Sequence, residues 1–397
     1  MLKAVFVISC LLGFTAANTA AMEPDTSSGY IGSGKCSMCH AEQYAAWETS
    51  KHAGISNEDA SGSQSRPDSD RAWVKNCAGC HVTNMNIQES TWTEKGVGCE
   101  ACHGPGEEHL SSGGDRGKIV SENAADICGR CHSRNTAGTG LMEDGTAWIV
   151  GYRPGMKLSS VPGLQMPTID PDALPPVPAD NHPFTYNMWE VSGHNNPSKQ
   201  TFTIGEKEWS GPITCTACHN PHQSSNRHQL VATPDALCSS CHPQNAVLKG
   251  VGAKGVEQTR SLHTAISCIE CHMTEKNHLM RIIRPDNPDL SAERTDTCSS
   301  CHEVKDRDIR AHQLQDWEAW YRDTLKPVAE DMLAIEETLK NNPALLNKEL
   351  RQKFEDTKSN LSIIEEDGSD GAHNLYYALE IMSLAKRDLS KIKAAIE

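Results

Sequence analysis

The chain has 397 residues and a formal net charge of −15, with 5% aromatic residues and a mean hydropathy of −0.53. This length accommodates one large domain or two, and the acidic balance excludes nucleic acid as an expected partner. With so few large apolar side chains, an aliphatic core would be thin for a chain of this length. We therefore expect something other than side chains to fill part of the interior.

Residues 1–21 have the pattern of a secretory signal peptide, with Lys3 before a short apolar run and small residues at its end. Cys10 lies in "VISC", which resembles a lipoprotein cleavage box, but the apolar run continues past it. The run is too short to span a bilayer, and we predict no transmembrane segment elsewhere. We expect an exported protein in the periplasm, with the outer surface or the extracellular space as alternatives.

The other 16 cysteines form eight C-x-x-C-H motifs, which we number 1 to 8 in chain order. Their cysteines are Cys36 and Cys39, Cys77 and Cys80, Cys99 and Cys102, Cys128 and Cys131, Cys215 and Cys218, Cys238 and Cys241, Cys268 and Cys271, and Cys298 and Cys301. The histidines that follow directly are His40, His81, His103, His132, His219, His242, His272 and His302.

C-x-x-C-H is the attachment motif of c-type haem. Its two thiols bond to the haem vinyl groups, and the histidine that follows reaches the iron as proximal ligand. Zinc ribbons use C-x-x-C pairs but do not need a histidine after each one, and disulfides would leave the histidines unexplained. The motifs therefore predict eight covalently attached c-type haems, each with its iron, and leave no cysteine of the mature chain for a disulfide.

Ten histidines lie outside the motifs, a suggestive number for eight distal iron positions. They are His52, His109, His182, His194, His222, His228, His263, His278, His312 and His373. Two histidines on one iron give a low potential, so we expect mostly low-potential electron carriers. His52 and His194 end the repeated segments "WETSKH" and "WEVSGH". We predict that the tryptophan of each segment stacks on a porphyrin and that the histidine binds an iron.

The motifs form two groups of four. After the signal peptide we expect an N-terminal tetrahaem region at 22–140 and a C-terminal tetrahaem region at 213–302. Between them, residues 141–212 are proline-rich and contain the segment of His194, and we expect an irregular connection that crosses the surface. Short helices should carry the motifs, with loops between them. The predicted fold is mostly α with extensive irregular loops, built around a stacked haem core and ending in long C-terminal helices.

Residues 303–397 contain no motif, and their apolar residues recur at helical spacing. The pattern predicts helices over 304–340, over 343–365 with Pro343 at the start, and from about 374 to 396. These helices should pack on one another or join subunits. His373 stands at the head of the third helix, where it can reach back to a haem.

Residues 30–135 resemble the tetrahaem cytochrome family that accepts electrons from hydroxylamine oxidoreductase in ammonia oxidisers. The matching stretches are "KCSMCHAEQYAAWETSKHA", "NCAGCHV" and "GVGCEACHGPGEEH". The resemblance implies that His109 binds the iron of motif 1 and His52 that of motif 3. It also implies that the haem of motif 2, with His81 as proximal ligand, is five-coordinate and has an open face.

The second half resembles the superfamily of hydroxylamine oxidoreductase and pentahaem nitrite reductase, through "TCTACHNPH", "HTAISCIECHM", "NHLMRIIRP" and "GAHNLYYALE". The resemblance implies a mostly α-helical fold and a homo-oligomer through the C-terminal helices. It also implies distal ligands at His222, His263, His278 and His373. The chain departs from the family's catalytic features. It has no C-x-x-C-K motif and no haem motif between motifs 4 and 5, and Tyr376 and Tyr377 are offset from the family's crosslinking tyrosine.

Three functions remain open. The first is electron transfer along the haems, with quinol-linked proteins or other cytochromes as redox partners. The second is catalysis at the haem of His81, which would reduce or oxidise a small nitrogen or sulfur compound such as nitrite or hydroxylamine. His182, His228 and Lys75 are candidate donors for that site. The third is an extracellular filament in which a histidine of one subunit caps a haem of the next.

Overall fold

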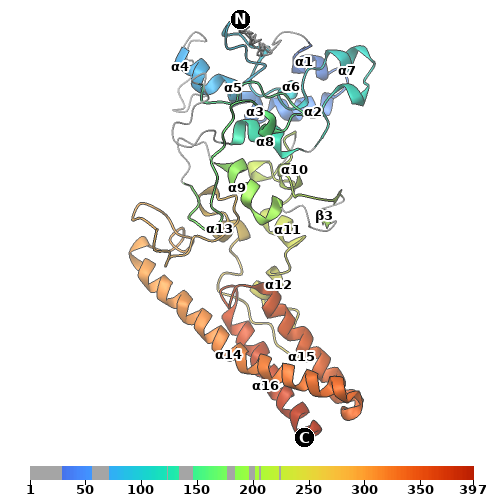
Figure 1. Ribbon diagram of the computed structural model, residues 1–397, viewed down its shortest axis with the longest axis vertical. Helices are drawn as coiled ribbons and strands as arrows, with labels where there is room; N and C mark the ends of the chain where they lie inside the picture. The colour runs from blue at the N-terminus through green and yellow to red at the C-terminus, as the bar shows by residue number, and fades with distance from the viewer. Residues whose placement is uncertain are drawn as a thin grey trace, which may run out of the picture.

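The computed structural model describes residues 29–55, 71–122, 124–133, 146–176, 184–195, 202–204, 207–222 and 225–397. The molecule is elongated, with the first motifs at one end and three long helices at the other (Figure 1). The signal peptide, Cys10 and His182 lie outside the described residues.

Up to residue 302 the described helices are short, and seven of the eight motifs have residues in an α-helix, while motif 8 lies in turns. The helices at the motifs are α1 (Ser33–Cys36), α5 (Gly79–His81), α6 (Cys99–His103), α8 (Ala125–His132), α10 (Cys215–Cys218), α11 (Pro234–Ser239) and α13 (Cys268–His272). The others are α2 (Ala41–Glu48), α3 (Lys51–Gly54), α4 (Arg71–Trp73), α7 (Glu107–Ser111), α9 (Thr185–Val191) and α12 (Asn245–Lys249). A helical turn suits the motif because residues three apart share one face, so both cysteines point to the same side.

Strands contribute little to the fold. β1 (Val82–Thr83) pairs antiparallel with β2 (Glu94–Lys95), and β3 (Phe202–Ile204) pairs antiparallel with β4 (Lys207–Trp209). The prediction of a mostly helical protein with extensive loops and long C-terminal helices is confirmed.

The connection between the two motif groups was expected to be irregular and to cross the surface, but its described residues include α9 (Thr185–Val191) and a strand pair, and several of its side chains are buried. Trp148, Ile149 and Leu158 are 5%, 3% and 0% exposed. Ile149 and Leu158 pack in one cluster with Tyr186 and Trp189 of α9. The amide of Leu158 also donates to Asp126 Oδ1 on α8 at 2.7 Å. The prolines interrupt regular structure, but the apolar side chains between them are still buried against α8 and α9.

The C-terminal region consists of α14 (Arg307–Asn341), α15 (Lys348–Asp367) and α16 (Leu375–Ile396). The second helix was expected to begin at Pro343, but that residue opens a short 3₁₀ turn and α15 begins at Lys348. The reason is the capping residue: the Asn347 side chain accepts the amide hydrogen of Leu350.

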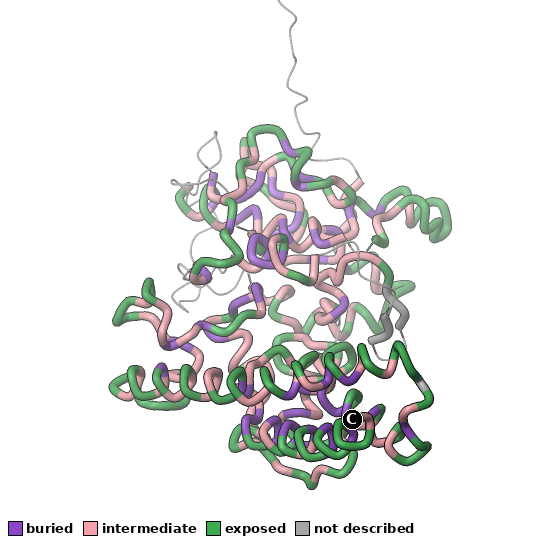
Figure 2. The backbone as a smooth tube through the Cα atoms, turned by 60° about the horizontal axis from the view of Figure 1, so that its bottom comes forward, coloured by how far each residue is buried: buried purple, intermediate pink, exposed green. Residues whose placement is uncertain are grey.

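The largest hydrophobic cluster lies between these three helices. Its fully buried members include Ile335, Ile364, Tyr377, Ile381 and Met382. Figure 2 shows buried residues between the C-terminal helices and exposed residues along their outer sides. The clusters around the motifs are much smaller, so the expected shortage of aliphatic core applies to the motif region only.

Candidate haem sites

Seven motif histidines each face a histidine from outside the motifs. The ring centroids lie 6.4 Å apart for His40–His109, 6.3 Å for His52–His132, 5.8 Å for His103–His222, 6.1 Å for His194–His242, 6.4 Å for His219–His278, 6.4 Å for His263–His302 and 6.1 Å for His272–His373. All seven predicted distal ligands therefore lie opposite a predicted proximal ligand.

This separation fits one iron between two imidazoles. An imidazole nitrogen binds such a metal at about 2.0 Å, and a ring with bonds of about 1.35 Å places its centroid about 1.15 Å behind that nitrogen. Two ligands on opposite faces of a haem would thus have centroids about 6.3 Å apart. Rings in direct van der Waals stacking would be closer, so the spacing points to an intervening metal. When bound, haem would supply one-electron chemistry at these positions.

Backbone carbonyls fix the ring tautomers at several of these sites. Nδ1 of His103 lies 2.6 Å from Val120 O, and Nδ1 of His219 lies 2.9 Å from His228 O. A carbonyl can only accept, so the proton is on Nδ1 and the lone pair of Nε2 is left for the iron. His373 differs, because its Nδ1 donates to a carboxylate, Asp367 Oδ1, at 2.7 Å.

Burial also prepares several rings to bind iron. Loss of solvent lowers the pKa of His52 and is the largest cause of the lowered pKa of His222, His263, His272 and His278. A lowered pKa keeps the imidazole neutral, and only the neutral ring can ligate a metal.

The pairing corrects one assignment from the resemblance and supports another. His109 faces His40 of motif 1, as implied. His52 was implied to serve motif 3, but its ring faces His132 of motif 4. Motif 3 instead faces His222, which comes from the second half of the chain. The two groups of four motifs are thus interlocked rather than separate.

Contacts between cysteines place neighbouring motifs in order. Cysteine side chains of different motifs lie side by side: Cys36 with Cys99, Cys80 with Cys131, Cys128 with Cys215 and Cys238 with Cys268. Further thiols lie close enough to interact electrostatically: Cys102 with Cys131, Cys218 with Cys241, and Cys271 with Cys301. The motifs therefore follow one another as 1–3–4–5–6–7–8, with motif 2 beside motif 4.

Two carboxylates strengthen this order. Glu100, inside motif 3 and 1% exposed, accepts the Gly32 amide before motif 1 at 2.7 Å. Asp235, just before motif 6, accepts the amide of Cys268 in motif 7 at 3.1 Å. Each carboxylate holds the segment of one motif against that of its neighbour.

The surroundings of motif 2 are closely packed. A Cβ on Gly79 would lie 1.8 Å from the Trp148 ring, so only glycine fits there. The Trp148 indole donates to Val74 O at 3.1 Å. Nothing in the sequence linked Trp148 to this motif, since 71 residues separate it from Cys77. The open face at His81 that the resemblance implies stays a prediction.

Two candidate donors and one further histidine remain among the described residues. Lys75 is exposed, and His228 is placed by its backbone oxygen, which accepts from His219. His312 is exposed on α14 and bonds its own helix at Asp308 O.

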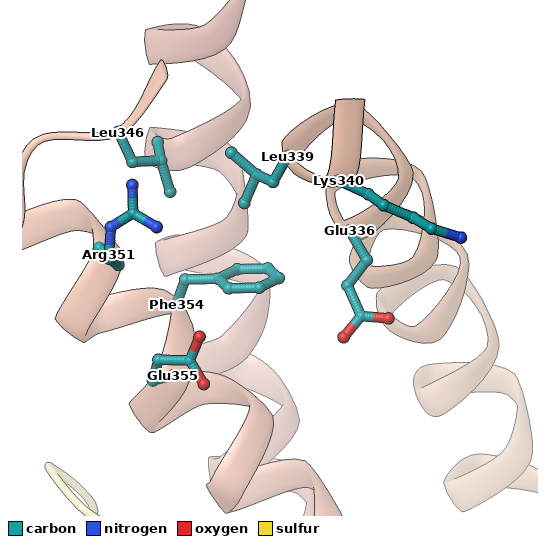
Figure 3. A pocket seen from close by; sticks show the side chains of 7 residues that line it. All are labelled: Glu336, Leu339, Lys340, Leu346, Arg351, Phe354 and Glu355. Atoms are coloured by element: carbon teal, nitrogen blue, oxygen red, sulfur yellow. The ribbon is translucent and has the colours of Figure 1, made fainter. Parts of the chain in front are cut away.

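A pocket outside the motifs lies between α14 and the start of α15 (Figure 3). Its lining residues are Glu336, Leu339, Lys340, Leu346, Arg351, Phe354 and Glu355. The lining contains no histidine and no cysteine, so this pocket is not part of a haem site.

Comparisons with known proteins agree with this picture. The family model "Cytochrome c554 and c-prime" matches residues 35–104, and the model "Doubled CXXCH motif" matches residues 210–247. Cytochrome c-554 of Nitrosomonas europaea is 32% identical over 102 residues. That match covers 21% of this chain and only 43% of the relative's length.

Two solved structures share the fold. The outer cell wall cytochrome OcwA has a TM-score of 0.72 at 20% identity, over 91% of this chain and 100% of that one. An undecahaem cytochrome from the S-layer of Carboxydothermus ferrireducens has a TM-score of 0.56 at 19% identity, over 91% and 69%.

The motifs and these similarities place the chain in the class of multihaem c-type cytochromes, whose C-x-x-C-H motifs bind haem covalently. Within that class, its N-terminal part is similar to the cytochrome c554 family. None of the described helices is long and apolar enough to cross a membrane.

Proposed function

We propose that this chain is an exported octahaem cytochrome that carries electrons along a row of mostly bis-histidine haems. The main support is the set of seven histidine pairs whose imidazole ring centroids lie 5.8 to 6.4 Å apart. Imidazole on both faces of the iron stabilises the ferric state, so these haems would work at low potential.

The order of the motifs supports a row with accessible ends. Motifs 1 and 8 stand at the two ends, and the second cysteine and the histidine of each are exposed. At motifs 3, 4, 5 and 7 the second cysteine is at least partly buried, whereas at motif 6 the second cysteine and the histidine are exposed as well. Electrons would enter and leave near motifs 1 and 8, in exchange with quinol-linked proteins or other cytochromes.

We place this activity at the cell exterior. The two solved structures that share the fold are named for the outer cell wall and the S-layer. This favours the outer surface over the periplasm, which the sequence had favoured. Fractionation of the native host, with detection by haem staining, would decide between these compartments.

Intact mass followed by a reductive titration tests the proposal. We expect the mass of the chain plus eight haems, and uptake of eight electrons over a wide range of low potentials. A holo-protein with clearly fewer haems, or one that takes up its electrons mainly at high potential, would contradict it.

A second candidate function is catalysis at the haem of Cys77, Cys80 and His81. The family match over residues 35–104 favours it, since it includes this motif and the resemblance implies an open iron there. Low-temperature EPR of the oxidised protein should then give about one high-spin ferric haem per chain. Turnover of nitrite, hydroxylamine or a sulfur oxyanion should be lost in the His81→Ala variant. A fully low-spin protein would remove this candidate.

Assembly is a separate part of the proposal. Ile309 and Tyr376 are 61% and 63% exposed on α14 and α16, and we propose that these helices join copies of the chain into a homo-oligomer. Light scattering should give a discrete dimer or trimer. Open-ended growth would instead support the filament.

A further inference from the structure

The tryptophan and the histidine of the repeated Trp-Glu-x-Ser-x-His segment make the same backbone contacts in both copies. In the first copy, the Trp47 indole donates to Val97 O at 2.8 Å. The Val97 amide in turn donates to His52 O at 2.8 Å. Val97 lies two residues before Cys99, the first cysteine of motif 3.

The second copy repeats this geometry with different residues. The Trp189 indole donates to Ile213 O at 2.7 Å, and the Ile213 amide donates to His194 O at 2.9 Å. Ile213 lies two residues before Cys215, the first cysteine of motif 5. Cys99 follows Trp47 by 52 residues and Cys215 follows Trp189 by only 26. The shared geometry therefore does not come from a shared chain spacing.

In both copies the histidine serves the next motif, not the one that its tryptophan holds. His52 faces His132 of motif 4, and His194 faces His242 of motif 6. The interplanar angles of the two pairs are 81° and 73°. Each segment thus ties the distal ligand of one haem to the attachment segment of the haem before it.

The serine differs between the two copies, because Ser50 Oγ in the first accepts the amide of Ala53 at 3.3 Å and not that of His52. Ser192 Oγ accepts the amide of His194 at 3.2 Å, and Ser261 Oγ accepts the amide of His263 at the same distance. His263 also meets its partner nearly at right angles, at 78°, although no tryptophan precedes it at this spacing. The steep ring angle therefore accompanies Ser-x-His, and the tie to the neighbouring motif is specific to the two tryptophan segments.

We propose that Trp47 and Trp189 are positioning residues that couple adjacent haems in pairs, motif 3 with 4 and motif 5 with 6. The indole hydrogen bond holds the distal histidine in place against the neighbouring attachment segment. The haems of motifs 3 to 6 would then form two similar pairs, 3 with 4 and 5 with 6. The two pairs meet where Cys128 of motif 4 lies beside Cys215 of motif 5. This inference rests on the proposed bis-histidine ligation.

The variants Trp47→Phe and Trp189→Phe test it, because each removes the indole N–H and keeps most of the ring. Trp320→Phe, at an exposed position on α14, is the matched control. Each purified holo-protein is titrated with carbon monoxide after reduction. At a bis-histidine haem this gas binds only when the distal histidine leaves the iron, and the unaltered protein gives the background from any open haem. EPR of the oxidised form reports the relative orientation of the two histidine rings at each iron, and intact mass confirms that every haem is attached.

We expect each variant to loosen one distal histidine, with carbon monoxide affinity at that haem rising by up to about tenfold, the equivalent of one hydrogen bond. Trp47→Phe should alter one steep-angle low-spin signal and Trp189→Phe another, while Trp320→Phe changes neither. Unchanged binding and spectra in both variants would overturn the inference, as would an equal change at all haems. If the unaltered protein lacked low-spin haems, the proposed function itself would fail.

Discussion

The motif region and the C-terminal helices of this chain are stabilised in different ways. Residues 307–396 form three helices around one continuous aliphatic core, with ends capped by Asn347 and Asn374. The described residues between 29 and 302 form short helices, two small strand pairs and small buried clusters. The first region uses ordinary side-chain packing, and the second is arranged around pairs of histidines and cysteines.

This difference indicates what replaces the hydrophobic side chains that the motif region lacks. A haem is a large apolar plane, and eight of them attached by thioether bonds would replace side chains that the motif region lacks. Burial of apolar surface stabilises a fold whether the surface belongs to a residue or to a cofactor. The two regions should therefore respond differently to loss of haem and to loss of aliphatic side chains.

The largest effect should follow from removing one haem. In the double variant Cys215→Ala/Cys218→Ala, we expect the segments next to motif 5 to lose their order, because binding free energy of such a group is also folding free energy. Hydrogen exchange should show lost protection around α8, α10 and η6 (Arg227–Gln229), with α14 to α16 unchanged. Protection that stays uniform would mean that side chains alone hold the motif region.

The second prediction concerns a cavity made in the hydrophobic core of the C-terminal helices. Ile381 is fully buried on α16, and Ile381→Ala should lower the free energy of unfolding of this region by about 2–5 kcal/mol. Leu333→Ala, at a position 65% exposed on α14, should stay within about 0.5 kcal/mol. Chemical denaturation followed by far-UV circular dichroism measures both. A matching loss of haem absorbance would show that the regions are not energetically distinct.

A haem site that draws a residue from each of the two regions should respond in its potential. Asp367 at the end of α15 accepts from His373 Nδ1, and His373 faces His272 of motif 7. A carboxylate partner makes the ligand more basic and favours ferric iron. Asp367→Asn should raise the potential of one haem by roughly 60 mV, the equivalent of about 1.4 kcal/mol. Asp370→Asn is the control, and an equal shift in both variants would contradict the assignment.

The smallest effect concerns pH. The Arg284 guanidinium lowers the pKa of Asp286 to about 2, and Arg284 also bonds Glu318 on α14. Because the folded pKa is below the unfolded value of about 3.9, this stability is present above that value and is lost as pH falls toward 2. Asp286→Asn should remove up to about 1 kcal/mol at neutral pH, because the pair is partly exposed. Its unfolding free energy should then depend less on pH between about 4 and 2 than that of the unaltered protein.

The sequence predicted the C-terminal helices more completely than the arrangement of the motif region. Helical periodicity located α14 to α16 closely, since those helices are set by local patterns and caps. The motifs located the proximal ligands, because thiol and histidine spacing is dictated by haem chemistry. The sequence could not predict which proximal histidine each distal histidine faces. His52, for example, faces His132. That pairing depends on how distant segments pack, and so does the burial of Trp148 against Gly79.

The most direct test of the account is the EPR line shape of the fully oxidised holo-protein. Three histidine pairs are nearly parallel, at 11°, 20° and 27°, and three are steep, at 73°, 78° and 81°. Parallel axial rings give rhombic low-spin signals, and perpendicular rings give highly anisotropic ones. We predict both kinds, in similar amounts, accounting for most of the iron. A spectrum dominated by high-spin ferric haem would contradict the central claim that paired histidines hold these haems.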